Sequence, residues 1–261
     1  MKALIKSFAV VMIVINLISC NQADIEDNQQ VEGNISNSTI DLKDQIDLIN
    51  YSVSIDERVD SYEEHKTLKE KLTQLENSIL APAQEDLDEY SDILSKGDVK
   101  IVRLLATGSL TQINGGGNYY SFALKTHEYG NGSDISLRGN QFQIGFAGAD
   151  YGFFTDLGDI DITEVNASTP GVEYSYNYIT PTAEVQVRSE YRRFENGAHH
   201  RGHKYGSRIN VRNGHTYTVR SITYSDYDIL VAFKVVRIDE SDNSIILLWR
   251  MLKKYKTPNL Q

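Results

Sequence analysis

Short segments in which apolar side chains recur at every second residue dominate the chain from Val99 onward. This alternation is typical of strands with one buried face, and the near-continuous apolar runs 229–236 and 245–252 suit central strands buried on both faces. From these patterns we expect about eleven or twelve strands. No amphipathic helical pattern divides them, which disfavours a parallel α/β sheet. The pattern therefore predicts an antiparallel β-sandwich of jelly-roll or similar type. The other alternating segments lie at 99–105, 142–146, 174–178, 185–187 and 217–219.

Turn-forming residues fall between these segments. Asn213–Gly214 is a strong signal for a type I′ hairpin turn, because both central residues of that turn need positive φ. Gly139–Asn140 is a weaker signal of the same kind, and the polar residues 239–244 predict a longer loop.

Charge divides the chain into two parts. Residues 21–99 carry six Lys or Arg side chains against 20 Asp or Glu, a balance of −14, whereas residues 100–261 carry 18 against 16. An asymmetry of this size indicates separate modules. Since neither part is strongly basic, nucleic acid is not an expected partner.

The acidic part predicts a helical segment over 40–97, ahead of a β domain over 98–261. Its apolar residues repeat at spacings of four and three, as in a coiled coil or one amphipathic helix (Leu68, Leu72, Leu75 and Ile79, with Ile46, Ile49 and Val53 upstream). Pro82 interrupts the run, and a second helix is expected after it, ending at Gly97. The helices could form a homo-oligomer or bind a partner, or they could pack on themselves or on the next domain.

The first twenty residues read as an export signal. Lys2 and Lys6 precede a short apolar run, which ends at Leu17-Ile18-Ser19-Cys20. This ending resembles the lipobox of bacterial lipoproteins. The resemblance implies that residues 1–19 are removed, that Cys20 is acylated, and that 20–39 form a flexible tether. Asn21 after the cysteine is similar to the pattern of outer-membrane lipoproteins. Acylation would consume the only thiol of the chain, leaving no disulfide and no cysteine nucleophile.

Three histidines stand close together in the β domain: His199, His200 and His203. With His127 or His215 they could bind Zn²⁺ through imidazole nitrogens. Against this, Arg201 and Lys204 lie among them and would repel a cation. The other interpretations are an exposed cationic hairpin loop, or a loop in which Arg201 and Lys204 contact an anionic glycan or a phosphate.

Carboxylates are dense in residues 150–164: Asp150, Asp156, Asp159, Asp161 and Glu164. Such oxygen ligands could hold Ca²⁺, with Asp156, Asp159 and Asp161 at its centre, although the spacing is not that of an EF-hand. A pair of them could also serve as acid and base in glycoside hydrolysis. The alternative is a turn in which Asp side chains accept backbone hydrogen bonds.

Tyrosine is abundant, with 16 Tyr against 8 Phe and 1 Trp. If residues 174–178 form a strand, Tyr174, Tyr176 and Tyr178 lie in a row at ~6.6 Å intervals and could stack on successive sugar rings. They could equally belong to the core. The sequence has no Gly-x-Ser-x-Gly elbow and no phosphate-binding glycine loop before a helix.

These features predict a cell-envelope lipoprotein, held at the membrane through its lipid anchor. Its β domain is expected to act as a non-catalytic binding module for a glycan or an envelope protein. Two alternatives stay open. The first is a glycan hydrolase or lyase that uses the acidic cluster 150–164 or the His199–His203 loop. The second is a structural subunit that assembles through its helices. No cofactor is firmly implied, beyond the Ca²⁺ or Zn²⁺ considered above.

Overall fold

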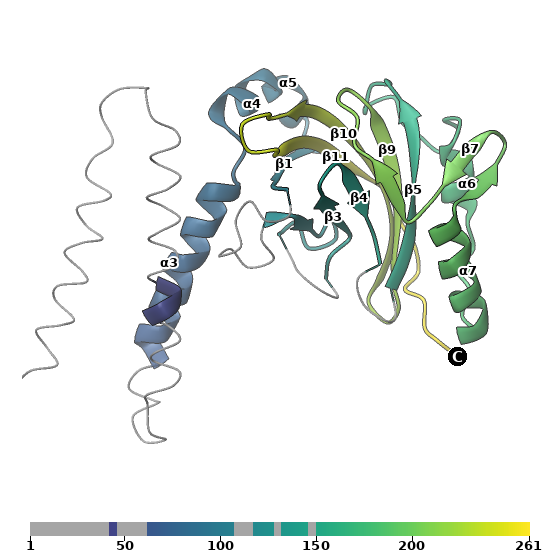
Figure 1. Ribbon diagram of the computed structural model, residues 1–261, viewed down its shortest axis with the longest axis horizontal. Helices are drawn as coiled ribbons and strands as arrows, with labels where there is room; N and C mark the ends of the chain where they lie inside the picture. The colour runs from purple at the N-terminus through teal and green to yellow at the C-terminus, as the bar shows by residue number, and fades with distance from the viewer. Residues whose placement is uncertain (1–41, 46–61, 107–116, 128–131, 146–149) are drawn as a thin grey trace, which may run out of the picture. The chain divides into compact units, whose positions relative to one another are not determined.

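The computed structural model describes residues 42–45, 62–106, 117–127, 132–145 and 150–261 (Figure 1). These residues form a mainly β structure with antiparallel sheets, as the alternating pattern predicts. The eleven strands of this part of the chain are β1 Lys100–Leu104, β2 Tyr119–Tyr120, β3 Ile135–Arg138, β4 Gln141–Gln143, β5 Asp150–Gly158, β6 Ala198–His200, β7 His203–Tyr205, β8 Arg208–Asn210, β9 Thr216–Thr223, β10 Tyr227–Ile238 and β11 Ile245–Lys254.

Two sheets make up the sandwich. The larger has the order β1-β11-β10-β9-β5, and the smaller has the order β2-β3-β4-β8. All of their pairings are antiparallel. The pair β6–β7 forms a separate hairpin. The sandwich-like arrangement is therefore confirmed, whereas a jelly-roll topology is not.

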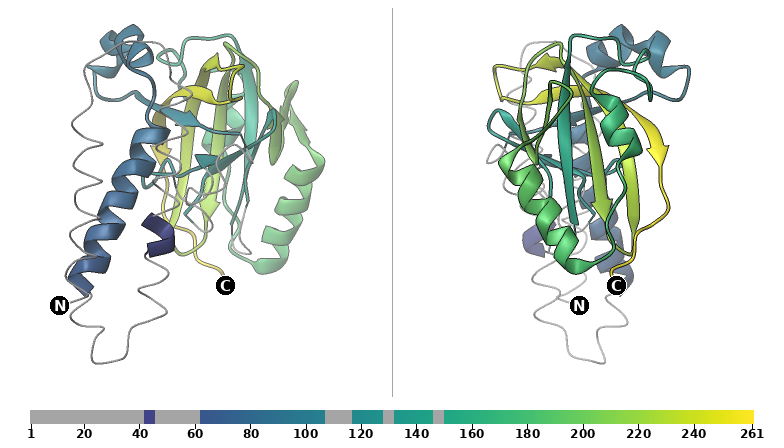
Figure 2. Two further views of the ribbon diagram at one scale, coloured as in Figure 1. Left: turned by 60° about the vertical axis from the view of Figure 1, so that its left-hand side comes forward. Right: turned by 90° about the vertical axis from the view of Figure 1, so that its right-hand side faces the viewer.

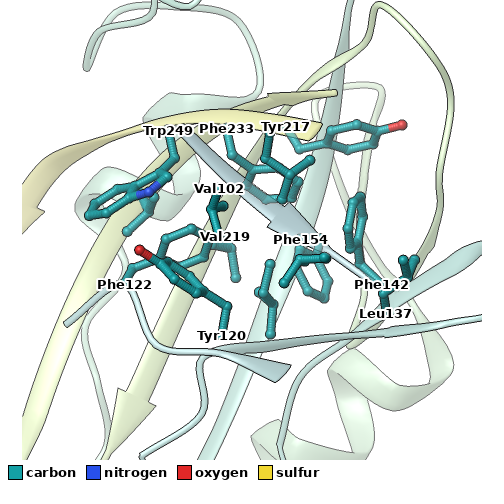
Figure 3. Close-up of a cluster of buried hydrophobic side chains, with 14 of the residues drawn as sticks. Val102, Tyr120, Phe122, Leu137, Phe142, Phe154, Tyr217, Val219, Phe233 and Trp249 are labelled. Atoms are coloured by element: carbon teal, nitrogen blue, oxygen red, sulfur yellow. The ribbon is translucent and has the colours of Figure 1, made fainter. Parts of the chain in front are cut away.

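The main core lies between the two sheets (Figure 3). At one end Phe122 packs on Trp249, with ring centroids 5.1 Å apart, and at the other Phe142 meets Phe233 at the same distance. The long apolar runs follow from their position: Val231 and Phe233 face this core, while Leu230 and Ala232 of the same strand belong to a second cluster on the other face of the sheet. Both faces of β10 are thus buried, as its sequence predicts.

Helices and loops cover that other face. The short helices α4 (Gln84–Glu89) and α5 (Ser91–Leu94) lie against the second cluster, to which α5 contributes Ile93 and Leu94 and the residue between the helices contributes Tyr90. Two further helices, α6 (Val172–Asn177) and α7 (Glu184–Asn196), pack near β5 at the other end of the sheet (Figure 2). Phe194 of α7 stacks on Phe153 of β5 with centroids 4.0 Å apart. This contact places the end of α7 beside the β6–β7 hairpin.

The helical prediction for the acidic part holds where the structure describes it. The helix α3 spans Tyr62–Leu80 and carries the predicted apolar stripe. Leu68 is buried and packs with Leu42, against which Leu72 and Leu75 also lie. The Arg103 guanidinium donates a hydrogen bond to the Ile79 carbonyl, which ties the end of α3 to β1. Part of the stripe is therefore covered within the chain. The predicted helix after Pro82 is broken at Tyr90 into α4 and α5.

Two predicted strands are wrong. Residues 174–178 lie largely in α6, and residues 185–187 lie in the 13-residue helix α7. The alternation Glu184-Val185-Gln186-Val187 imitates a strand over four residues. However, Arg188 bonds Glu184 and Arg193 bonds Glu190, at the (i, i+4) and (i, i+3) spacings that stabilise a helix. The expectation that no amphipathic helix divides the strands is therefore also wrong, because α7 lies between β5 and β6.

The turn predictions divide in the same way. Gly139–Asn140 does connect paired strands, because Arg138 of β3 lies opposite Gln141 of β4. Asn213–Gly214 does not form a type I′ hairpin turn, since Asn213 lacks the required positive φ. The reason is topological: β8 and β9 belong to different sheets, so the turn between them crosses the sandwich.

Several predictions concern residues outside the described part of the chain. These are the signal peptide 1–19, Cys20, the tether to residue 39, and the apolar repeat Ile46, Ile49 and Val53. Within the described residues, none of the helices has the length and apolar character needed to span a bilayer.

Candidate functional site

A polar groove lies beside the β6–β7 hairpin, where the end of α7, strand β8 and the loop after β8 meet. Its volume is about 570 Å³. The groove collects titratable side chains from separate parts of the sequence: Asp156, Glu195, His203, Lys204, Arg208 and Arg212. It is the place where the structure brings part of the histidine loop and part of the acidic cluster together.

The hairpin that forms one wall has a tight turn. Arg201 and Gly202 both have positive φ, 47° and 83°, as a type I′ turn requires. His199 lies opposite Lys204, and His200 lies opposite His203. The interpretation of this segment as an exposed hairpin loop is therefore confirmed. Gly197 leaves room for the Lys204 side chain, because a Cβ there would lie 2.6 Å from Lys204 Cε.

Cations in the groove are incompletely neutralised. Among the described residues, neither the Lys204 ammonium nor the Arg208 guanidinium has an ion-pair partner, and both residues are exposed. Arg212 lies 3.5 Å from Asp156, at the edge of ion-pair distance. In the described part of the chain, the Glu195 carboxylate is the lining carboxylate that has no ion-pair partner. The groove thus holds three cationic side chains and two carboxylates, and one of these carboxylates, that of Asp156, already has hydrogen-bond partners.

The Asp156 carboxylate is held by hydrogen bonds within the chain. Its Oδ1 lies 2.9 Å from His215 Nδ1 and accepts a hydrogen bond from the Gly158 backbone N–H at 2.8 Å. The loop that carries Arg212 is fixed by Tyr217, whose hydroxyl accepts from the Arg212 N–H and donates to the Asn210 carbonyl. Burial raises the pKa of Tyr217, so this hydroxyl stays protonated. Asp156 and Tyr217 therefore hold the rim of the groove in place.

The rest of the acidic cluster does not converge on the groove. Asp159 is exposed and pairs with Lys234 at 2.7 Å, and this hydrogen bond lowers the pKa of its carboxyl. Asp161 accepts hydrogen bonds from the backbone N–H and the hydroxyl of Thr163, which likewise lower its pKa. Asp150 lies buried at the start of β5. The turn interpretation is confirmed for Asp156 and Asp161, each of which accepts a backbone hydrogen bond two residues on.

The predicted metal sites find no support in this arrangement. His200 packs on Tyr174 with ring centroids 5.0 Å apart, and His203 lies against Gly171. His199 pairs in register with Lys204 instead, so it lies on the other face of the hairpin from His200. In the part of the chain that is described, no group of three or more His, Cys, Asp or Glu residues is placed to hold a metal ion.

The three tyrosines do not form the predicted row. They lie on a helix and its end, so their rings diverge. Tyr174 and Tyr178 turn toward Phe153, with centroids 5.9 and 5.1 Å away, whereas Tyr176 lies under Lys253. All three are half-buried. The spacing of four between Tyr174 and Tyr178 is the signal that favours a helix here.

Sequence reasoning found Lys204 but missed Arg208 and Arg212, which face the same groove. They belong to no recognisable motif, and the only hint is the spacing of four residues that separates Lys204, Arg208 and Arg212. Arg201, which the sequence groups with Lys204, points elsewhere and pairs with Glu173 at 2.7 Å. Comparisons with protein-family models, with curated proteins and with solved structures found no match to this chain. Its function is therefore argued from the site.

Proposed function

We propose that the chain is a lipid-anchored protein of a bacterial cell envelope and that its β domain binds an anionic ligand in the groove. The ligand is a glycan that carries carboxylate, phosphate or sulfate groups, or the acidic surface of an envelope protein. Leu17-Ile18-Ser19-Cys20 supports the anchor. The observation that carries the binding role is the pair of unneutralised cations, Lys204 and Arg208, in one polar groove.

Several cations in one groove support the binding of a ligand with several anionic groups. The groove is open and polar, and single exposed ion pairs contribute only about 0–1 kcal/mol each. An extended ligand with several anionic groups would gain from Lys204, Arg208 and Arg212 together. Because exposed charges are screened within roughly 8 Å at physiological ionic strength, this affinity should fall as salt is added.

The test compares acidic and neutral glycans of equal length by thermal unfolding and calorimetry of the mature chain. A ligand at about 100 times its Kd raises the free energy of unfolding by about 2.7 kcal/mol. We expect stabilisation by acidic glycans only, and its loss in Lys204→Gln and Arg208→Gln.

Two control variants sharpen this test. Arg201→Gln removes the same charge from the same hairpin but outside the groove, and should leave affinity unchanged. Glu195→Gln removes a lining anion and should strengthen binding. The proposal fails if neutral and acidic glycans act alike, or if Arg201→Gln weakens binding as much as Lys204→Gln does.

A hydrolase is the second candidate, favoured by the Asp156–His215 contact at 2.9 Å beside the groove. A carboxylate on Nδ1 orients the imidazole and leaves Nε2 to act as a general base. In that case the chain should release new reducing ends from a bound glycan. His215→Gln should abolish the release without weakening binding. If the glycan stays intact after long incubation, the hydrolase candidate is wrong and only the binding role remains.

A further inference from the structure

Exposed aliphatic side chains gather at the end of the β domain where α7 begins. Ile179 is 87% exposed and Val185 is 81% exposed, the two highest values among the large hydrophobic side chains of the described residues. Leu260 is 44% exposed and lies close by, because the Gln261 N–H donates to the Thr182 carbonyl at 2.9 Å. In Figure 1 the C-terminus accordingly lies beside this end of α7. We call Ile179, Val185 and Leu260 the apolar tip.

The backbone that presents the apolar tip is firmly held. The Thr180 hydroxyl donates to Asp228 at 2.7 Å, and the Tyr224 hydroxyl donates to the Pro181 carbonyl at 2.5 Å. Asp228 is itself buried in a salt bridge with Arg220. These hydrogen bonds fix the backbone on which the apolar side chains are exposed to solvent. Exposed aliphatic side chains on a backbone that is held in this way suit a contact surface.

Cations follow the apolar tip along α7. Arg188 and Arg192 lie three and seven residues after Val185, on the same side of the helix, and Arg188 is already paired with Glu184 at 2.5 Å. Arg192 is exposed and has no ion-pair partner among the described residues. At 1.5 Å per residue, Arg192 lies about 10 Å from Val185 along the helix axis. Apolar groups enter a bilayer to a depth of ~5–10 Å, which would leave Arg192 among the headgroups.

We propose that the apolar tip inserts shallowly into a phospholipid bilayer containing anionic lipids, as a second membrane contact besides the acyl anchor. A second copy of the chain is a poorer occupant, because a stable interface buries roughly 800 Å² per partner and three aliphatic side chains supply little of that area. The proposed anchor at Cys20 already keeps the domain within tether length of a membrane. The inference rests on the proposed function for this location only, and not on ligand binding in the groove.

Insertion of the apolar tip would orient the candidate site. Glu195 lines the groove at the opposite end of α7 from Val185, about 15 Å away along the axis at the usual helical rise. The groove would then stand clear of the lipid surface and open toward ligands beyond it.

The first test uses the mature chain without its acyl groups and phospholipid vesicles with and without anionic lipid. We expect partition onto the anionic vesicles. The double variant Ile179→Asp/Val185→Asp should lose it by about tenfold or more, because two aliphatic groups are replaced by charges. Leu124→Asp changes another exposed aliphatic side chain (56% exposed) outside the tip and should have no effect. Circular dichroism verifies that each variant is folded.

The second test uses the acylated chain, in which Cys20 has no free thiol. Val185→Cys and Leu124→Cys each introduce one thiol for an environment-sensitive fluorophore. Nitroxide groups on the lipid acyl chains should quench the probe at position 185 and spare the probe at position 124. Equal quenching at both positions would overturn the proposal. So would vesicle binding that depends on Lys204 and Arg208 instead of the tip, or a dimer in solution that the double variant dissociates. Loss of ligand binding in the groove would overturn the proposed function and leave this inference standing.

Discussion

The Arg220 guanidinium donates to both carboxylate oxygens of Asp228, at 2.6 and 2.8 Å, in the interior of the β domain. The two side chains are 1% and 2% exposed. Arg220 also donates to the Ser175 carbonyl of α6 and lies over the Tyr255 ring, while Asp228 accepts from Thr180. One ion pair thus joins β9 and β10 to α6, to the loop before α7 and to the C-terminal segment.

Removing one partner of this pair should be costly. Asp228→Asn leaves a buried guanidinium without its counter-charge, and we expect it to lower the free energy of unfolding by about 3–5 kcal/mol. Glu184→Gln, which breaks an exposed pair on α7, should cost less than about 1 kcal/mol. Urea denaturation of both variants measures the difference. Equal losses would show that the buried pair has no special weight in this fold.

His127 should make the fold sensitive to mild acid. Its Nε2 bonds the Arg103 carbonyl at 2.8 Å, so the ring donates this proton while neutral, and burial lowers its pKa below the usual value. Its contribution to stability is therefore fully present above about pH 6.5, the unfolded value, and is lost as the pH falls toward the folded value. The melting temperature should fall between pH 7 and pH 5, and less steeply in His127→Gln. A parallel decline in both proteins would assign the effect to other groups.

The strands could be predicted from the sequence, whereas the groove could not. Strands β9, β10 and β11 are predictable because burial on one or both faces leaves a local pattern in the residues themselves. Helix α7 is missed because residues 184–187 alternate as in a strand. The evidence for a helix lies in ion pairs between residues three or four positions apart, which a search for alternation does not consider. The groove is harder still. Lys204, Arg208 and Arg212 meet only after the hairpin folds back and the chain crosses between sheets, and no local pattern records that crossing.

Asp134 should act on stability in the opposite direction to His127. Its carboxyl is fully buried and accepts hydrogen bonds from the backbone of Phe122 and Ala123 and from the Ser221 hydroxyl. Burial outweighs these contacts and raises its pKa. The fold therefore favours the protonated carboxyl, and its contribution to stability is lost as the pH rises from about 4 through the folded value. The wild-type chain should lose stability relative to Asp134→Asn over this range in urea titrations. A difference that grows in favour of the wild type would contradict the assignment.

Gly152 should tolerate no side chain. It is the third residue of β5, where a Cβ would stand 2.2 Å from the Arg220 carbonyl oxygen and 2.4 Å from Ile144 Cδ1. The carbonyl belongs to a paired strand and cannot move away freely. We expect Gly152→Ala to lower the free energy of unfolding by about 1–3 kcal/mol, as overpacking does. Chemical denaturation checks this value, and a variant as stable as the wild type would show that the two strands separate easily here.

Gly202 links backbone geometry to the candidate site. Its φ of 83° suits glycine, and a Cβ there would meet nothing within 4 Å, so Gly202→Ala introduces strain without collision. Gly97, with φ of 84° and equally open surroundings, is the matched control between α5 and β1. Both substitutions should lower the free energy of unfolding by about 1–2 kcal/mol, the cost of left-handed backbone in a residue with a Cβ. Only Gly202→Ala disturbs the turn that positions Lys204, so it alone should weaken the binding of an acidic glycan. Calorimetry on the two variants separates the effects, because an equal loss of affinity in Gly97→Ala would trace it to general destabilisation instead of to the hairpin.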